Sequence, residues 1–152
     1  MLTIKQLSQR ELRHVAEEVA ELRKLYIADN NALGLSAPEA AEQVEWREPT
    51  DSVDVAVLVS SESKDTRGLH YPAIDIDVPC HLVPSATPGH FHLYIDRAVS
   101  WEDYCAILLA LTRTNIVSEY YYDQTLRRGA SFVRKPGVLK PEEPEIKLES
   151  TE

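Results

Sequence analysis

Two pairs of ionisable residues, each pair spaced two positions apart, lie within residues 71–96 and are the residues most suggestive of chemistry in this sequence. Asp75 and Asp77 form the first pair, and His90 and His92 form the second. Because successive side chains of a β-strand point to opposite faces, each pair would project from one side of its strand. Two such strands lying side by side would bring four potential ligands together.

The aspartate pair sits in an otherwise apolar run, AIDIDV, in which Ile74, Ile76 and Val78 would share the opposite face of a strand over residues 73–78. A carboxylate must stay hydrated, paired or bound to a cation, so the aspartate face is either solvent, a cleft or a metal site. Carboxylates hold Mg²⁺ or Mn²⁺ in this way, often with substrate phosphates completing the coordination. Ordinary alternation on a half-exposed strand is the alternative interpretation.

The histidine pair permits a related chemistry. As neutral imidazoles, His90 and His92 would bind Mn²⁺ or Zn²⁺, and as cations they would meet phosphate. A polar strand edge explains the same spacing without any ligand. Both pairs within one short stretch favour a site at this place in the chain.

A second set of candidate residues lies nearer the C-terminus. Asp123 precedes the run that begins at Arg134, and Pro136-Gly137 predicts a tight turn between Arg134 and Lys140. Both basic side chains would be able to contact an anion near that turn. A surface turn with ordinary basic residues is the alternative.

The element that opens the chain is predicted to be a helix from Ser8 to about Ala28. Ser8 and Glu11 have the spacing of a capping box, in which each side chain pairs with an amide of the first turn. Apolar residues then follow at alternating steps of three and four: Leu12, Val15, Val19, Leu22 and Tyr26. This stripe predicts a helix that packs on its own domain or forms the contact of a homodimer.

The other elements follow from caps, β-branched runs and turn residues. A short second helix is expected from Ser36 to about Trp46, with Pro49 ending the helical portion, and another helix from Ser100 to about Thr114. Strands are expected at 53–59, 73–78, 91–96 and 131–134, and a strand or extended segment at 119–122. Connections are expected at 60–68, at the turn-rich segment 80–89 and at 127–129.

This order predicts an α+β fold, with N-terminal helices followed by a small, mainly antiparallel sheet and one packed helix. Residues 1–50 would form the N-terminal helical portion, 51–140 the α+β core and 141–152 a disordered acidic tail. At 152 residues the chain fits a single compact domain.

Composition excludes some classes of protein. The net charge of −9 argues against a non-specific nucleic-acid coat, although residues 97–140, with seven basic and four acidic side chains, would suit a polyanion. No apolar run approaches the roughly 18 residues of a membrane span, and the N-terminus is unlike a signal peptide, so we expect a cytoplasmic protein without a membrane contact. Cys80 and Cys105 are then expected to be reduced packing residues.

The order of these motifs resembles that of archaeo-eukaryotic-type primases and the prim-pol proteins of phages and plasmids. The matching residues are the D-x-D run Ile74–Asp77, the segment Thr87–Tyr94 with its histidines, Asp123, the turn at Arg134–Gly137, and Lys140. The resemblance implies two Mg²⁺ or Mn²⁺ ions on Asp75, Asp77 and Asp123, a triphosphate contact from His92, and nucleotidyl transfer with a nucleoside triphosphate or nucleic acid as partner. The segment PSATPGHFHLYID is also similar to small proteins of actinobacterial phages, which implies a phage origin and the host cytoplasm.

Three hypotheses about function follow. The first is a metal-dependent nucleotidyl- or phosphoryl-transfer site of the prim-pol type, active or degenerate. The second is a non-enzymatic phage protein that binds a protein partner through its N-terminal helix or acidic tail. A phosphodiesterase with His90 and His92 as acid and base ranks last, because the chain lacks the H-x-[ST] motifs of the two-histidine phosphoesterases.

Overall fold

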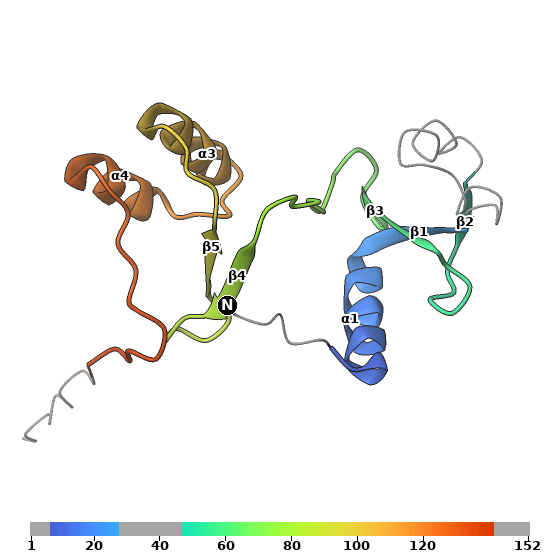
Figure 1. Ribbon diagram of the computed structural model, residues 1–152. Coiled ribbons are helices and arrows are strands. Elements are labelled where there is room, and N and C mark those ends of the chain that lie inside the picture. The colour runs from blue at the N-terminus through green and yellow to red at the C-terminus, as the bar shows by residue number, and fades with distance from the viewer. Residues whose placement is uncertain (1–6, 28–46, 142–152) are drawn as a thin grey trace, which may run out of the picture. The chain divides into compact units, whose positions relative to one another are not determined.

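The computed structural model describes residues 7–27 and 47–141, which belong to two compact units, Met1–Asp75 and Ile76–Glu152 (Figure 1). We call these unit 1 and unit 2. The predicted α+β class is confirmed, because the described residues form three helices and two small antiparallel sheets. The predicted helix at 36–46 and the tail at 142–152 lie outside the described residues.

The first helix begins as predicted but ends earlier. Helix α1 spans Gln9–Leu22, and its capping box is present: the Ser8 amide donates to Glu11 Oε2 at 2.7 Å and the Glu11 amide to Ser8 Oγ at 3.2 Å. Strand β1, Arg23–Ile27, follows without a break, so Tyr26 is not part of a helical stripe. Pairing with a strand on each side satisfies the backbone of β1, which outweighs the helical spacing of the sequence.

The sheet of unit 1 has the strand order β2-β1-β3, with β2 at Glu48–Thr50 and β3 at Leu58–Ser63, both antiparallel to β1. Leu25 at its centre lies opposite Thr50 on one side and Val59 on the other. The predicted helical portion 1–50 therefore contains two strands and is joined by the sheet to residues beyond it.

The predicted strand at 53–59 is misplaced, because β3 starts at Leu58 and continues through serines that were expected to be a loop. The serine hydroxyls make hydrogen bonds: Ser60 Oγ donates to the Lys24 carbonyl at 2.9 Å, and Ser61 Oγ lies 2.9 Å from His70 Nδ1. Residues 53–55 instead form a turn, and Val55 is exposed. A serine can occupy a strand position when its hydroxyl has a hydrogen-bond partner on the neighbouring strand.

Ala20, Leu25 and Tyr26 are the buried apolar residues among the described part of unit 1, and Tyr26 lies on the opposite face of β1 from Leu25. The Tyr26 hydroxyl donates to Glu62 Oε1 at 2.7 Å, and the Arg47 guanidinium lies 5.0 Å from the centroid of the Tyr26 ring. This cluster ties β1 to β3 and to the residue preceding β2 through a hydrogen bond and a cation–π contact.

Unit 2 begins with an antiparallel hairpin of β4, Cys80–Pro84, and β5, Phe91–Ile95. The strand predicted at 91–96 is confirmed, whereas half of the expected connection at 80–89 is strand β4. The turn between the strands is closed by the Ser85 amide, which donates to the His90 carbonyl at 2.9 Å, and contains Gly89 at φ 77°. A positive φ is the reason that glycine suits this position.

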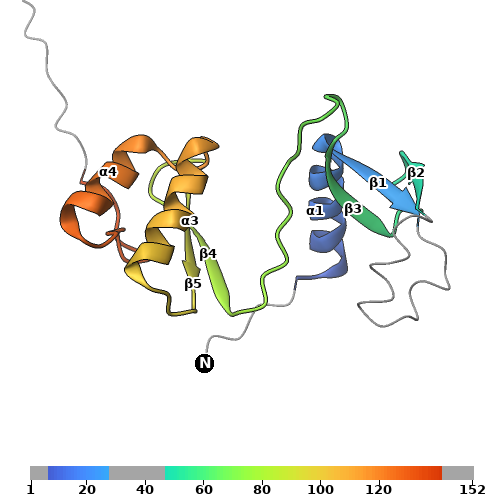
Figure 2. The same cartoon turned by 90° about the horizontal axis from the view of Figure 1, so that it is seen from above.

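Two helices follow the hairpin (Figure 2). Helix α3, Trp101–Arg113, is capped by Ser100 as predicted. Helix α4, Glu119–Arg128, occupies a region predicted as an extended segment and a turn. Its Ser118 cap and the left-handed Gly129 that ends it are ordinary helix signals that the prediction did not use.

Two predicted strands of the second half are absent. Residues 73–78 have no regular structure, and the boundary between the units falls inside this segment. Residues 131–134 follow α4 as an irregular segment. Neither segment pairs with a neighbouring strand among the described residues, and a β-branched run without a partner does not satisfy its backbone as a strand.

A hydroxyl network connects the helices of unit 2. The Tyr104 hydroxyl on α3 donates to Ser131 Oγ at 2.5 Å, and Ser131 Oγ lies 2.9 Å from Thr125 Oγ1 on α4. Thr125 and Leu108 are the buried residues among the described part of this unit. Burial raises the pKa of Tyr121, and Tyr104 and the strand residue Tyr94 contribute to the same rise.

The Tyr26 cluster gives a prediction about stability. Replacing Tyr26 by Phe removes a hydrogen bond to a carboxylate and should lower the free energy of unfolding by about 1–3 kcal/mol. The hydrogen bond to Glu62 is the main cause that raises the pKa of Tyr26. The folded state then keeps the phenol proton above pH 10, so this contribution is complete below about pH 10 and is lost as pH rises through the raised pKa.

Urea unfolding of the wild-type protein and Tyr26→Phe at pH 8 and above pH 10 measures both effects. The difference between the two proteins should shrink at the higher pH. Tyr120→Phe, at an exposed position on α4, is the matched control and should change little. Equal effects of the two substitutions would contradict the role given to the Tyr26 hydroxyl.

Candidate functional site

The aspartates of the D-x-D run do not share a strand face. Asp75 and Asp77 are both exposed and lie in a segment without regular structure. Asp75 is the last residue of unit 1, whereas Asp77 belongs to unit 2. The prediction that a strand aligns the two carboxylates is therefore wrong. The apolar residues between them are open as well, with Ile74 among the most exposed of the described side chains.

Of the H-x-H pair, His92 lies on the predicted strand, whereas His90 precedes it. His90 is exposed at the end of the hairpin turn, and His92 is half-buried on β5, opposite Val83. Asp123 is exposed on α4 rather than on an extended segment. The metal and triphosphate roles of these residues stay predictions.

One of the two basic residues around the Pro136-Gly137 turn contacts the β4–β5 hairpin. The turn is present as predicted, with the Val138 amide donating to the Lys135 carbonyl at 3.0 Å and Gly137 at φ 89°. Lys140 Nζ donates to Thr87 Oγ1 at 3.1 Å, so this lysine lies at the hairpin turn. Arg134 is exposed on the same segment.

Potential metal ligands do not cluster in the described part of the chain. No group of three or more His, Cys, Asp or Glu side chains among the described residues could hold a metal ion. One pair that the sequence analysis missed is His81 and Asp96, with His81 Nε2 at 3.3 Å from Asp96 Oδ2 at the open end of the hairpin. Two side chains of this kind make a polar contact rather than a metal cage.

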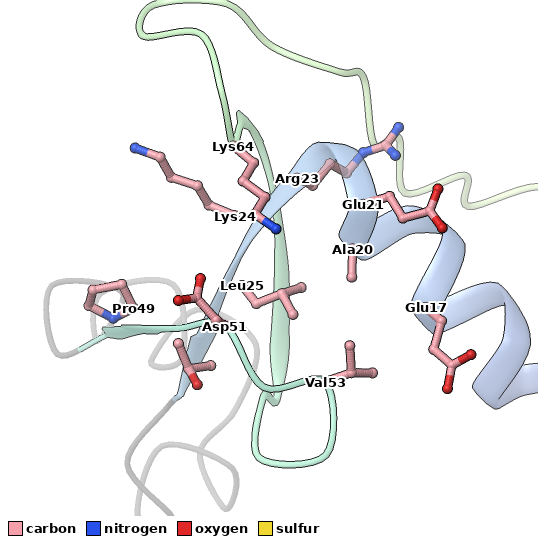
Figure 3. A pocket seen from close by; sticks show the side chains of 11 residues that line it. Glu17, Ala20, Glu21, Arg23, Lys24, Leu25, Pro49, Asp51, Val53 and Lys64 are labelled. Carbon is pink, nitrogen blue, oxygen red and sulfur yellow. The ribbon is translucent and has the colours of Figure 1, made fainter.

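Unit 1 has a pocket of about 520 Å³ between α1, β1 and residues 49–53 (Figure 3). Its size is that of a small-molecule site, but its lining carries charges of both signs rather than a mainly apolar wall. The acidic side chains are Glu17, Glu21 and Asp51, and the basic ones are Arg23, Lys24 and Lys64. No side-chain polar atom is buried without a hydrogen-bond partner among the described residues.

The apolar stripe of α1 is exposed, which corrects the prediction that it would be buried. Leu12, Val15 and Leu22 are 43–45% exposed, and Val19 is half-buried. The helix instead packs through Ala20, which is buried, with the half-buried Ala16 one turn before it. At 3.6 residues per turn these alanines lie about 100° around the helix from the stripe.

The hairpin of unit 2 has a second exposed apolar surface, which we call the outer face. It consists of alternate residues of both strands: Cys80, Leu82 and Pro84 of β4 with Phe91, Leu93 and Ile95 of β5. The period-two alternation of residues 80–84 and 91–95 is the signal that could have identified it. The outer face was not predicted, because the prolines and the glycine of residues 80–89 indicated a connection.

Comparison with known protein families, curated proteins and solved structures finds no match to this chain. Within the described ranges, none of the helices is long and apolar enough to cross a membrane.

The metal hypothesis has a direct test. If Asp75 and Asp77 hold Mn²⁺ together with a nucleoside triphosphate, the two ligands should raise the melting temperature by mass action, and Asp77→Asn should remove the increase. Asp65→Asn, at another exposed aspartate, is the control and should leave the increase intact. Titration calorimetry that detects neither metal nor nucleotide at millimolar concentrations would contradict the hypothesis.

Proposed function

We propose that this protein is a non-enzymatic binding module, and that the apolar stripe of α1 binds an amphipathic helix of a protein partner. The observation that supports the proposal is the exposure of Leu12, Val15 and Leu22 on a regular, capped helix. Exposed apolar side chains scattered singly are common on proteins, but a continuous row on one helix is typical of an interaction site.

The spacing of the stripe determines the kind of partner. Leu12, Val15, Val19 and Leu22 alternate in steps of three and four, which is the seam that a second helix packs against. With 14 residues, α1 is about 21 Å long, enough for a contact of two heptads. A helix that places its own apolar row against this seam removes both rows from water, at about 25 cal/mol for each Å² buried.

The charges beside the stripe determine the chemistry of the partner. Of the four glutamates of helix α1, Glu11 and Glu18 flank the stripe, whereas Glu17 and Glu21 lie on the far side of the helix at 100° per residue. Glu18 Oε1 is 2.9 Å from His14 Nε2 on the same helix. A partner helix with lysines or arginines beside its apolar row would complement these two flanking glutamates, and an acidic helix would be repelled.

Nucleotidyl transfer of the prim-pol type is supported by the order of sequence motifs alone. The described residues bring neither a third carboxylate near Asp77 nor a set of metal ligands around His92. A phage origin and the host cytoplasm rest on the same kind of evidence. A binding module requires only the surface that α1 presents, so we favour it.

A designed peptide tests the proposal. The probe is a labelled amphipathic helix of about 20 residues, long enough to be helical in water, with a leucine seam flanked by lysines. We expect it to bind the protein in fluorescence anisotropy, and Val15→Asp to weaken binding at least tenfold, about 1.4 kcal/mol. Val55→Asp, at an exposed apolar position outside α1, is the matched control.

The sign of the charge change separates stripe binding from simple attraction to an acidic protein. Val15→Asp and Val55→Asp both add one negative charge, so non-specific attraction of the lysine peptide would increase in both. Binding at the stripe should fall in Val15→Asp only. Equal affinity of the two variants, or equal binding of a peptide with glutamates in place of the lysines, would contradict the proposal.

A further inference from the structure

We propose that the outer face of the β4–β5 hairpin is the contact between two copies of this chain, stacked face to face around a twofold axis. The proposal concerns unit 2 and does not depend on the function proposed for α1. It rests on which side of the hairpin is apolar, how little unit 2 buries, and how large and how free of charge the apolar side is.

The hairpin has its apolar side turned away from its own helices. The inner side carries His81, Val83, His92 and Tyr94, all half-buried, and Tyr94 is near enough to Tyr121 of α4 to contribute to its raised pKa. The outer face carries apolar side chains only, and four of them, Leu82, Phe91, Leu93 and Ile95, are 47–65% exposed. A strand pair that meets solvent on one side normally turns its polar residues to that side. The reverse arrangement indicates that the outer face is covered in the assembled protein.

Unit 2 also buries few of its side chains. Leu108 and Thr125 are its buried residues in the described part of the chain. A two-stranded hairpin is marginal in water unless further strands or a packed layer cover an apolar face. A second hairpin stacked on the outer face would form a four-stranded sandwich with an apolar interior.

A second copy fits the outer face better than a charged partner. The face contains no ionisable group except the Cys80 thiol, so two chains of net charge −9 can approach each other there without placing like charges in contact. The central pair, Leu82 opposite Leu93, meets the same pair of the partner when the twofold axis passes through it.

The charged group at the open end of the hairpin lies on its inner side. Asp96 Oδ2 is 3.3 Å from Nε2 of His81, which is an inner-side residue. The Asp96 carboxylate is therefore directed away from the outer face and adds no charge to a contact made there.

The area is sufficient for a dimer of modest affinity. The six side chains contribute at most about 100 Å² each, roughly half of the 150–250 Å² that an aromatic side chain buries in full. The outer face therefore removes at most about 600 Å² per copy from water, or about 1,200 Å² in total. This is the lower limit of stable protein–protein interfaces.

Light scattering of the full-length protein at micromolar concentrations tests the proposal. We expect twice the 17.2 kDa mass of one chain for the wild type and a monomer for Leu93→Lys, because the substitution places two lysines together at the twofold axis. Ile116→Lys, at an exposed apolar residue of unit 2 outside the hairpin, is the matched control and should remain a dimer.

Mixing two variants separates a lost contact from a lost fold. Leu93→Lys and Leu93→Glu should each be monomeric, and an equimolar mixture should recover the dimer mass, because opposite charges then meet at the axis. A monomeric wild-type protein would overturn the proposal, as would a Leu93→Lys variant that remains dimeric. Failure of the mixture to form a dimer would overturn it too. A dimer broken by Val15→Asp but not by Leu93→Lys would assign self-association to α1 instead.

Discussion

The scarcity of buried apolar surface is the constraint on which the rest of this structure depends. Among the described residues, the buried apolar side chains are Ala20, Leu25, Tyr26 and Leu108, three in unit 1 and one in unit 2. Hydrogen bonds hold each unit in shape: Tyr26 with Glu62 in one and the Tyr104–Ser131–Thr125 hydroxyls in the other. A net gain of about 1 kcal/mol for each such bond cannot replace a core, because ordering each residue costs as much.

The two exposed apolar surfaces have the same physical origin. Helix α1 packs on its sheet through alanines, which leave its larger residues outside, and the hairpin turns histidine and tyrosine toward its helices, which leaves leucine, phenylalanine and isoleucine outside. In each case the side of the element that packs within its own unit is the less apolar one. The driving force for burial is then available for association, which is why we infer a partner helix for α1 and a second copy for the hairpin.

Local signals in the sequence predicted what local interactions determine. The caps at Ser8 and Ser100, the turn at Pro136-Gly137 and the strand at 91–95 depend on near neighbours, and all were predicted correctly. Helix α4 and strand β4 were missed although their signals are also local, and other errors occurred where distant pairing decides. Residues 23–27 continue a helical pattern yet become the central strand, because two strands far along the chain bond to them. Residues 73–78 have a strand-like pattern but no partner strand among the described residues, so they stay irregular.

The alternation of histidines with apolar residues at 90–95 first suggested a ligand site. The packing of the β4–β5 hairpin explains part of this alternation. Alternation at residues 90–95 identifies two faces of a strand but does not say which face is inside. An H-x-H-x-Y row next to an F-x-L-x-I row predicts histidines in water if the domain is alone, and the structure has His92 and Tyr94 on the side of α3 and α4 instead. With the polar row inward, only a second covering layer removes both rows from water. The inward position of His92 therefore leaves the apolar row of the same strand exposed, and this exposure is the reason to infer association. The positions of the helices decide which row lies inside, and the sequence pattern does not contain them.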